Sequence, residues 1–324
     1  MANIIGRLMA VGLGKETTRG TAVAPSFFIP QTEFSVMDRD EKIMDTSALG
    51  RIEEAHDGDQ DHQWAEGSLA GVIRDRSFGL ILLAAFGQVS SALKGAETVV
   101  YNHDFSVANT NTHPSLTIAA KDANEDLRMA LGMLSRLEIR AELGGYLTYT
   151  ADFIAKKSAA ATNTTSYTVE NKFRPQDLTL KVADTVANLG AATATQITSL
   201  TLTIEKNTEA DYALGTHDIV EIFNKQFTTS VAFTARYSST ALKDLVFNGS
   251  KRAMSIAVTR SDITIGTASN PAMTFTFRPG FFNSWSKEGG LDDILSQNIE
   301  YSGLYSTSDS AELTATLTNT VTGY

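Results

Sequence analysis

Short segments in which apolar and polar residues alternate recur along the chain, and this rhythm is typical of half-buried β-strands. In the second half such segments cover residues 178–182, 197–204, 231–237, 254–258, 273–277 and 311–317. In the first half they cover residues 116–119, 137–141 and 149–153. Their Thr and β-branched side chains suit a pleated surface. The pattern predicts a mainly β protein of the sandwich or barrel class.

Two short segments break this alternation and carry the end signals of helices. Residues 77–87 run from Ser77, a suitable N-cap, through an apolar stretch to Gly87, a suitable C-cap. Residues 239–249 run in the same way from Ser239 to Gly249. We therefore expect one short α-helix in each half of the chain.

A shift of 162 residues, half the chain length, brings the two predicted helices into register. The same shift places residues 69–73 on 231–235, 137–139 on 299–301 and 151–153 on 313–315. A matched order of strand, helix and late strands indicates a duplicated domain. Because the run at 156–165 is small and polar, we predict a first domain over residues 1–160 and a second over 161–324.

The segment from 37 to 63 is rich in acidic residues and has no apolar period, so we expect a long irregular loop. Loops of this length are often functional. We expect this loop, and the amino-terminal arm before Pro30, to contact neighbouring molecules. The counterpart at 207–226 has apolar side chains that indicate docking on a surface: Tyr212, Leu214, Ile219, Val220, Ile222 and Phe223.

Composition narrows the class of protein. The chain has 324 residues, 42% hydrophobic and 20% charged, which is enough for two domains of roughly 150 residues each. Cys is absent, which excludes disulfides and thiolate chemistry and fits synthesis in a reducing cytoplasm. The amino terminus lacks a signal-peptide pattern. The longest apolar stretch, 78–86, is about half of the roughly 20 residues of a membrane-spanning helix, so no membrane contact is expected.

The net charge is −10, from 37 acidic and 27 basic residues. This balance opposes the basic surface that firm binding of nucleic acid requires. An acidic wall repels phosphate, so a duplex could pass along it without adhering.

Two loop motifs are incomplete. Residues 12–17 hint at a phosphate-binding loop, but Met9 stands where its first Gly belongs, and Glu16 follows Lys15 in place of a hydroxyl residue. Residues 57–61 begin like a calcium loop, but His62 replaces the Gly of its turn and Ser68 replaces its bidentate Glu. Neither a nucleotide nor calcium is expected as a ligand.

The remaining candidates for chemistry are histidines and tryptophans. His56 and His62 have no third His or Cys nearby to complete a metal site, so we interpret them as surface residues. Trp64 and Trp285 fit core or interface anchors better than a sugar-binding platform. Three further histidines are separated in sequence and lie in no nucleophile motif: His103, His113 and His217. We predict no enzyme activity and no catalytic, cofactor-binding or metal-binding residue.

The opening sequence, VGLGKETTRGTAVAP at 11–25 followed by FFIP at 27–30, resembles the start of tail tube (major tail) proteins of long-tailed, non-contractile bacteriophages. The later order of parts is also similar, because GSLAG at 67–71 leads into the apolar helix that ends at Gly87. The closing segments 299–305 and 317–319 continue the likeness. The resemblance covers most of the chain and lies in its layout more than in invariant residues.

The resemblance implies two tandem β-sandwich or barrel domains, each with one flanking helix. In such a structural virion protein, rings of six domains surround a channel and stack, through a long loop and terminal arms, into the tail tube that conducts DNA during ejection. With duplicated domains, a homotrimer would form a pseudo-hexameric ring; six whole chains are the alternative. The implied partners are further copies, other tail proteins at the tube ends, and DNA that passes without specific contacts.

Two other classes remain open. An outer-membrane barrel would also alternate, but it needs an export signal and repeated strands of about ten residues. A receptor-binding or carbohydrate-binding β protein of the virion would need a carboxylate pair or an aromatic platform, which the sequence does not reveal.

Overall fold

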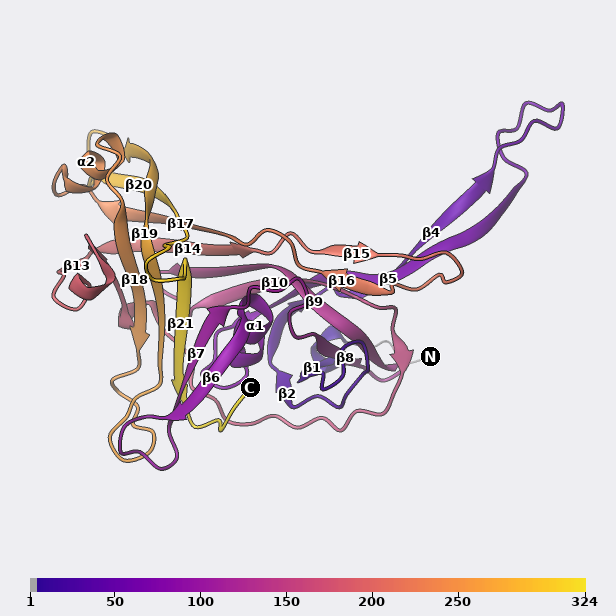
Figure 1. Cartoon of the computed structure of the whole chain (residues 1–324), viewed down its shortest axis with the longest axis horizontal. Helices are drawn as coiled ribbons and strands as arrows, with labels where there is room; N and C mark the ends of the chain where they lie inside the picture. Colours follow the sequence, from indigo (N-terminus) through magenta and orange to yellow (C-terminus); the bar gives the residue numbers. More distant parts are fainter. Residues whose placement is uncertain (1–4) are drawn as a thin grey trace.

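The computed structural model describes residues 5–324 and shows a mainly β protein with two short α-helices set far apart (Figure 1). Every predicted strand segment is a strand, which confirms the fold class. Short 3₁₀ turns lie at Gly6–Leu8, Pro175–Asp177 and Val186–Asn188.

A long antiparallel sheet runs through the whole molecule. Each strand pairs with the next in this order: β3 (Gln31–Phe34), β5 (Asp57–Val72), β10 (Thr148–Ala155), β9 (Asp126–Glu142), β14 (Ile197–Glu205), β17 (Thr228–Arg236), β20 (Ser296–Ser302) and β19 (Ala272–Glu288). The first four strands belong to the first half of the chain and the last four to the second half.

Two shorter sheets pack against the long sheet. The first joins, in order of pairing, β2 (Phe27–Ile29), β1 (Ala10–Lys15), β8 (Leu116–Lys121), the amino-terminal part of β9 and β11 (Ala159–Ala160). The second joins β13 (Ala194–Thr195), β12 (Leu178–Ala183), β18 (Arg252–Thr259), the amino-terminal part of β19, β21 (Leu313–Asn319), β7 (Tyr101–Val107) and β6 (Gly87–Leu93). One continuous apolar core fills the space between the sheets of both halves.

The order of pairing repeats between the halves. β8, β9, β10, β5 and β3 are neighbours in the first half, as β18, β19, β20, β17 and β14 are in the second. The uniform shift of 162 is therefore wrong for the late strands, because it places residues of β9 on β20 rather than on β19. The reason is an insertion: β6 and β7 follow the first helix and have no equivalent after the second. The division near residue 160 stays a prediction, and β7 crosses it by pairing with β21.

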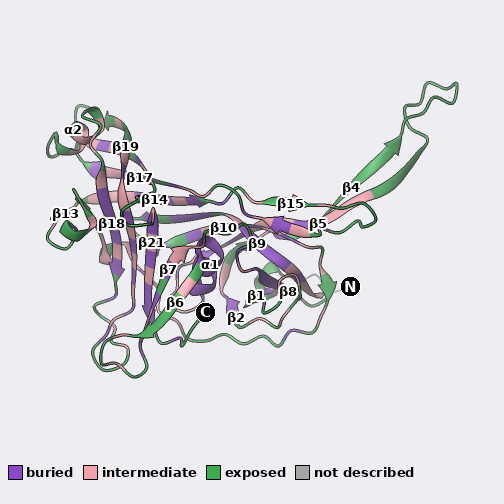
Figure 2. Ribbon diagram, viewed as in Figure 1, coloured by how far each residue is buried: buried purple, intermediate pink, exposed green. Residues whose placement is uncertain are grey.

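Both predicted helices are present, as α1 (Phe78–Phe86) and α2 (Ala241–Phe247). Gly87 ends α1 in the left-handed region at φ 85°, which glycine adopts without strain, and its N–H bonds to the Leu83 carbonyl. The caps of α2 are Thr240 and Asn248 rather than the predicted Ser239 and Gly249, and Gly249 follows with φ 61°. Neither Ser77 nor Thr240 makes a side-chain capping bond. All nine residues of α1 are buried, whereas none of α2 is, a contrast visible in Figure 2.

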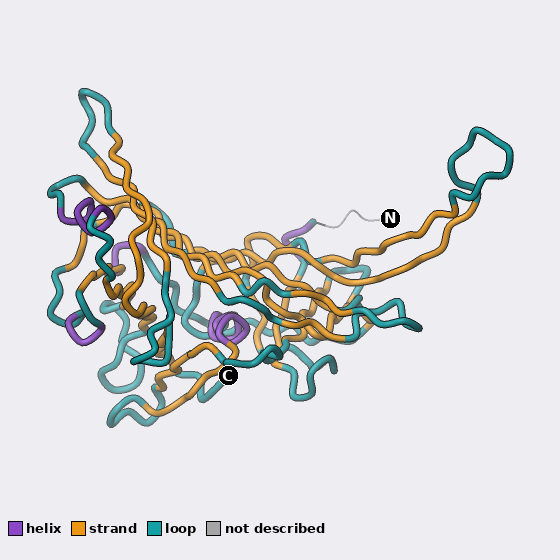
Figure 3. The backbone as a smooth tube through the Cα atoms, turned by 45° about the horizontal axis from the view of Figure 1, so that its top comes forward, coloured by secondary structure: helices purple, strands orange, loops and turns teal. Residues whose placement is uncertain are grey.

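The predicted irregular loop at 37–63 is wrong in detail. Residues 37–45 form β4 (Met37–Asp45), which pairs with the first part of β5 in a hairpin that extends away from the body (Figure 3). Every residue of β4 is exposed, so neither face has the apolar alternation that reveals a half-buried strand in sequence. The counterpart at 207–226 is a smaller hairpin of β15 (Glu209–Asp211) and β16 (Glu221–Phe223).

Candidate functional site

The long sheet has one face in the core and one polar face that is largely open. In β9, Leu137 and Ile139 are buried in the core, while Arg136, Glu138 and Arg140 lie on the opposite side. The same side of β14 and β17 carries mainly short hydroxyl side chains: Ser199, Thr201, Thr203, Ser230 and Thr234. A groove of about 410 Å³ lies over the strands of the second half on this side.

Both arginines of β9 on the polar face are paired with carboxylates. Glu138 is 6% exposed and accepts hydrogen bonds from both Arg136 and Arg140. Arg136 also lies 3.8 Å from Glu205 of the neighbouring strand. Further carboxylates occur on the same side of the sheet: Glu66, Asp152, Glu142 and Glu300. Because both guanidinium groups are already bound to carboxylates, they are poorly placed to grip phosphate.

The junction between the halves is a continuous piece of this sheet. β9 and β14 pair from Glu142 and Ser199 to Arg136 and Glu205. The β15–β16 hairpin crosses the junction on the polar side, where its Ile219 and Ile222 form a small buried cluster with residues of β9. Strand pairing and side-chain packing therefore hold the two halves together.

At the two ends of the long sheet, no further strand pairs with the outer edge within residues 5–324. β3 pairs only with β5, and residues 281–288 of β19 pair only with β20. A groove of about 940 Å³ lies beside β3, lined by Met9, Gln31, Phe34 and Tyr167 among others. Unpaired edges with free N–H and C=O groups are sites at which a further strand adds.

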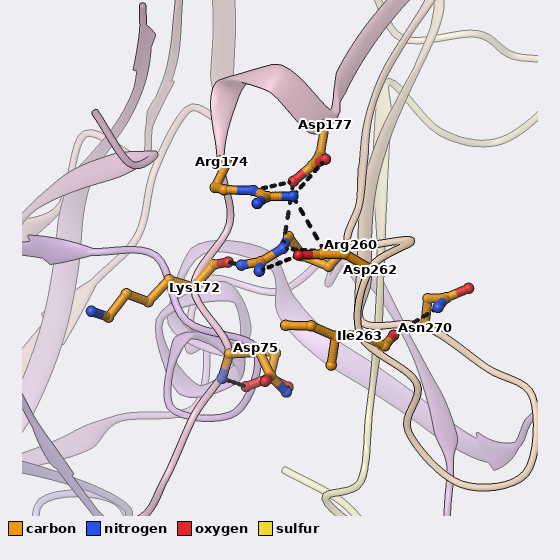
Figure 4. Close-up of polar contacts among 9 residues, drawn as sticks. Asp75, Lys172, Arg174, Asp177, Arg260, Asp262, Ile263 and Asn270 are labelled. Carbon is orange, nitrogen blue, oxygen red and sulfur yellow. Dashed lines mark hydrogen bonds and ion pairs between the residues drawn. The ribbon is translucent and has the colours of Figure 1, made fainter. Parts of the chain in front are cut away.

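Residues 170–177, which follow the predicted junction at 156–165, form an ordered strap. Arg260, in the turn after β18, donates to the Lys172 carbonyl and to both carboxylate oxygens of Asp262 (Figure 4). Arg174 binds Asp177 at 2.8 Å and Asp262 at 3.2 Å. The hydrogen bond from Arg260 is the main cause that lowers the pKa of Asp262.

The strap also reaches the start of α1. Glu170 accepts hydrogen bonds from the backbone and hydroxyl of Ser77, and Asn171 donates to Asp75 from both its backbone and its amide. Burial raises the pKa of both Glu170 and Asp75. Phe173 is fully buried beside them. The connection between the halves is therefore fixed rather than loose.

The incomplete loop motifs lie in strands. Gly12 and Gly14 are in β1, where a side chain on either would collide with residues 23–25, so close packing accounts for the glycines. Glu16 is buried and accepts hydrogen bonds from Ser115 and Thr117. Residues 57–61 lie in the extended start of β5 rather than in a calcium-type turn.

The structure separates His56 from His62. His56 lies 3.3 Å from Asp45, whereas His62 lies 2.7 Å from Asp61 and forms a group with Glu41 whose ligand atoms are within 4.8 Å of one another. This is the one cluster with metal-type ligands in the described part of the chain. Glu41 is exposed and the other two are half-buried, so solvated side chains account for the arrangement.

The two tryptophans occupy different settings. Trp64 packs against the small cluster beneath the β15–β16 hairpin. Trp285 lies on the outer strand β19, with Phe247 and Tyr237 at 6.3 and 6.1 Å between ring centroids. Both therefore act as packing residues, and Trp285 is partly open to solvent at the edge.

The buried histidines lie in polar networks of the interior. His103 contacts Ser91 at 2.8 Å and Asn319 at 3.0 Å, a Ser–His–Asn order that superficially resembles a catalytic relay. Ser91 lies in a regular strand and pairs directly with His103, without the sharp turn that presents a nucleophile. Burial lowers the pKa of His103. The geometry supports a hydrogen-bonded tie across three strands.

His113 and Lys206 form a second network that the sequence did not reveal. Lys206 is 1% exposed, and its Nζ donates to the Ala84 carbonyl at 2.6 Å, near the end of α1. Burial lowers the pKa of Lys206 to about 7. Burial, with the cations of Lys206 and Arg19, lowers the pKa of His113 to about 4. A Lys between Glu205 and Asn207 carries no sequence signal of burial, because its partners are distant in the chain.

The sequence profile of phage tail tube proteins matches residues 6–303. The chain belongs to the phage tail tube protein family. This confirms the resemblance noted in the sequence, and the β-rich fold agrees with it. The tail tube family places the chain among the structural components of the virion tail.

No curated protein matches the chain. Within residues 5–324, none of the helices of this tail tube family member has the length and apolar character needed to cross a membrane.

Proposed function

We propose that three copies of the chain close into a ring of six similar domains and that rings stack into the tail tube. The observation that carries this proposal is the β9–β14 junction, at which the second half continues the sheet of the first. The outer strands β19 and β3 hold the corresponding places at the two ends of the long sheet, and each lacks a partner on its outer side within the described chain. If β19 of one copy paired with β3 of the next, the unpaired N–H and C=O groups of both edges would be hydrogen-bonded.

The direction of the strands supports this closure. The long sheet has eight strands, all paired antiparallel, so β19 of one copy runs antiparallel to β3 of the next when the sheets are joined in sequence. This is the same relation that β9 has to β14. A repeated interface of one kind either closes into a ring or extends as a filament, depending on the angle between copies.

The polar face then lines the channel. Its short hydroxyl side chains and carboxylate-paired arginines make a hydrophilic wall that does not retain phosphate, as ejection of DNA requires. The projecting β4–β5 hairpin is available for contact between rings, because its tip carries the exposed apolar residues Leu49 and Ile52. Other tail proteins would cap the ends of the tube, and synthesis would take place in the host cytoplasm.

Cryo-electron microscopy of the purified protein or of isolated tails tests this proposal, with the symmetry determined before any is imposed. We expect rings of three chains with a sixfold pseudosymmetry and the polar face inside. Rings of six whole chains, or a channel lined mainly by Lys and Arg, would contradict the proposal.

A further inference from the structure

The two equivalent helices differ in what covers them. α1 is covered in part by the second half of the chain: Lys206 donates to the Ala84 carbonyl, and the ring of Phe227 lies 6.3 Å from that of Phe86. α2 has no buried residue, and Phe247 in its last turn is 69% exposed. The covering that α1 receives from the second half is therefore lacking on α2 within the described chain.

α2 forms a partly exposed aromatic and basic surface with the outer strand β19. We call it the α2 patch, and its residues are Tyr237, Lys243, Phe247, Trp285 and Lys287. Lys243 lies 5.4 Å from the ring centroid of Trp285, and Lys287 lies 5.3 Å from that of Tyr237. Aromatic residues are enriched at protein interfaces, and each lysine lies within cation–π distance of one of these rings.

The opposite end of the long sheet has a pocket of complementary character. We call it the β3 pocket; its volume is about 290 Å³ and its lining includes Met9, Phe34, Val36, Asp38, Glu125 and Met129. Asp38 and Glu125 are exposed at its rim. Lys121 is also on the rim, but it is bound to Asp126 at 3.0 Å and to the Asn163 carbonyl. The pocket is thus apolar inside and acidic at its edge.

The internal repeat indicates that these two surfaces meet. Lys206, which contacts α1, directly follows β14, and β14 pairs with β17 as β3 pairs with β5. The segment of the first half that corresponds to the end of β14 is therefore the one that follows β3, residues 35–38. These residues line the β3 pocket.

We infer that the α2 patch of one copy docks into the β3 pocket of a second copy, with Phe247 among Phe34 and Met129 and with Lys243 facing Asp38. This inference rests on the proposed ring and names the contact that closes it. The occupant is a second copy, because the α2 patch lies at the unpaired edge of β19. The equivalent strand of the first half, β9, is paired with β14 inside the chain. The opposite charges of the two surfaces agree with this pairing.

Mixing two variants tests the inference. A patch variant carries Lys243→Glu and Phe247→Asp, and a pocket variant carries Asp38→Lys and Glu125→Lys. Each keeps one surface intact, so we expect each alone to be monomeric in analytical ultracentrifugation and an equimolar mixture to associate into species larger than the monomer. Val169→Asp, at a residue that is 93% exposed and lines neither the α2 patch nor the β3 pocket, is the matched control and should form rings.

Substitutions of one exposed or partly exposed charge are unlike core substitutions in that they leave the fold intact, so they test association separately from folding. We expect Lys243→Glu to weaken association by about tenfold or more, and Asp38→Lys in the same chain to restore most of it. Rings from the patch variant, or no rescue by the charge exchange, would overturn the inference while leaving the proposed ring intact. Failure of the unmodified protein to form rings would instead overturn the proposed function.

Discussion

Substituting Gly79 by Ala should destabilise the protein, although Ala is the better helix former. Gly79 lies in the first turn of α1, and a Cβ at this position would overlap the ring of Tyr324. That ring is held in place, because the Tyr324 hydroxyl donates to the Arg76 carbonyl at 2.5 Å and accepts from Asn319 at 2.6 Å. The substitution therefore has to displace a ring that is fixed by two hydrogen bonds.

The size of the effect follows from two opposing contributions. Overpacking a fixed core site costs about 1 to 3 kcal/mol, and loss of a hydrogen bond to Tyr324 adds about 1 kcal/mol. The higher helix propensity of alanine offsets at most about 1 kcal/mol of this loss. We expect the free energy of unfolding to fall by about 2 kcal/mol, measured by urea unfolding followed by circular dichroism.

A double-mutant cycle checks the reasoning. Tyr324→Ala alone should cost about 3 kcal/mol, the lower end of the range for removal of an aromatic ring from the core, because the ring is partly buried. In that background Gly79→Ala should become neutral or stabilising by up to about 1 kcal/mol, because the obstruction is gone. The corresponding helix position of the second half is Ala241, which is exposed, so Ala241→Gly should cost about 1 kcal/mol or less. The reasoning is refuted if Gly79→Ala is equally destabilising with and without the Tyr324 ring.

Three further outcomes are expected. The pKa of His113 is about 4 in the folded protein, against 6.5 for an unperturbed histidine. The unfolded chain therefore binds the proton first, and the free energy of unfolding should fall by about 2 to 3 kcal/mol as the pH drops from 6.5 to 4. Acid unfolding of His113→Gln should show a smaller decrease over the same pH range. Arg260→Met should lower the free energy of unfolding by about 2 kcal/mol, and more than Arg174→Met does, because Arg260 is the less exposed of the two; equal effects would contradict this role for the strap. Deleting residues 46–55 should leave the melting temperature unchanged and yield rings that do not stack, and tubes of normal length in electron micrographs would refute a stacking role.

The strands and the carboxyl end of α1 were predictable because their signals are local. β14 and β17 bury every second residue, and Gly87 follows an apolar run, so periodicity and a C-cap suffice to place them. β4 could not be predicted, since all its residues are exposed. The pairing of β7 with β21 also could not, because strand periodicity shows which face is buried and not which distant strand lies alongside.

Only part of the candidate site could be predicted from the sequence. The resemblance to tail tube proteins indicated assembly, but not the two open edges of the long sheet. These depend on long-range pairing, as does the burial of Lys206 against α1.

The β9–β14 junction forms when a single chain folds, so its formation does not depend on protein concentration. Two separate domains would have to find each other in solution and lose translational freedom, whereas the strap across residues 170–177 holds them at a high effective concentration. In the proposed ring, joining two domains in one polypeptide thus removes every second encounter from assembly. Each half would also meet only halves of the other kind, which leaves the two sequences free to differ, as the wholly apolar α1 and the lysine- and aspartate-bearing α2 do.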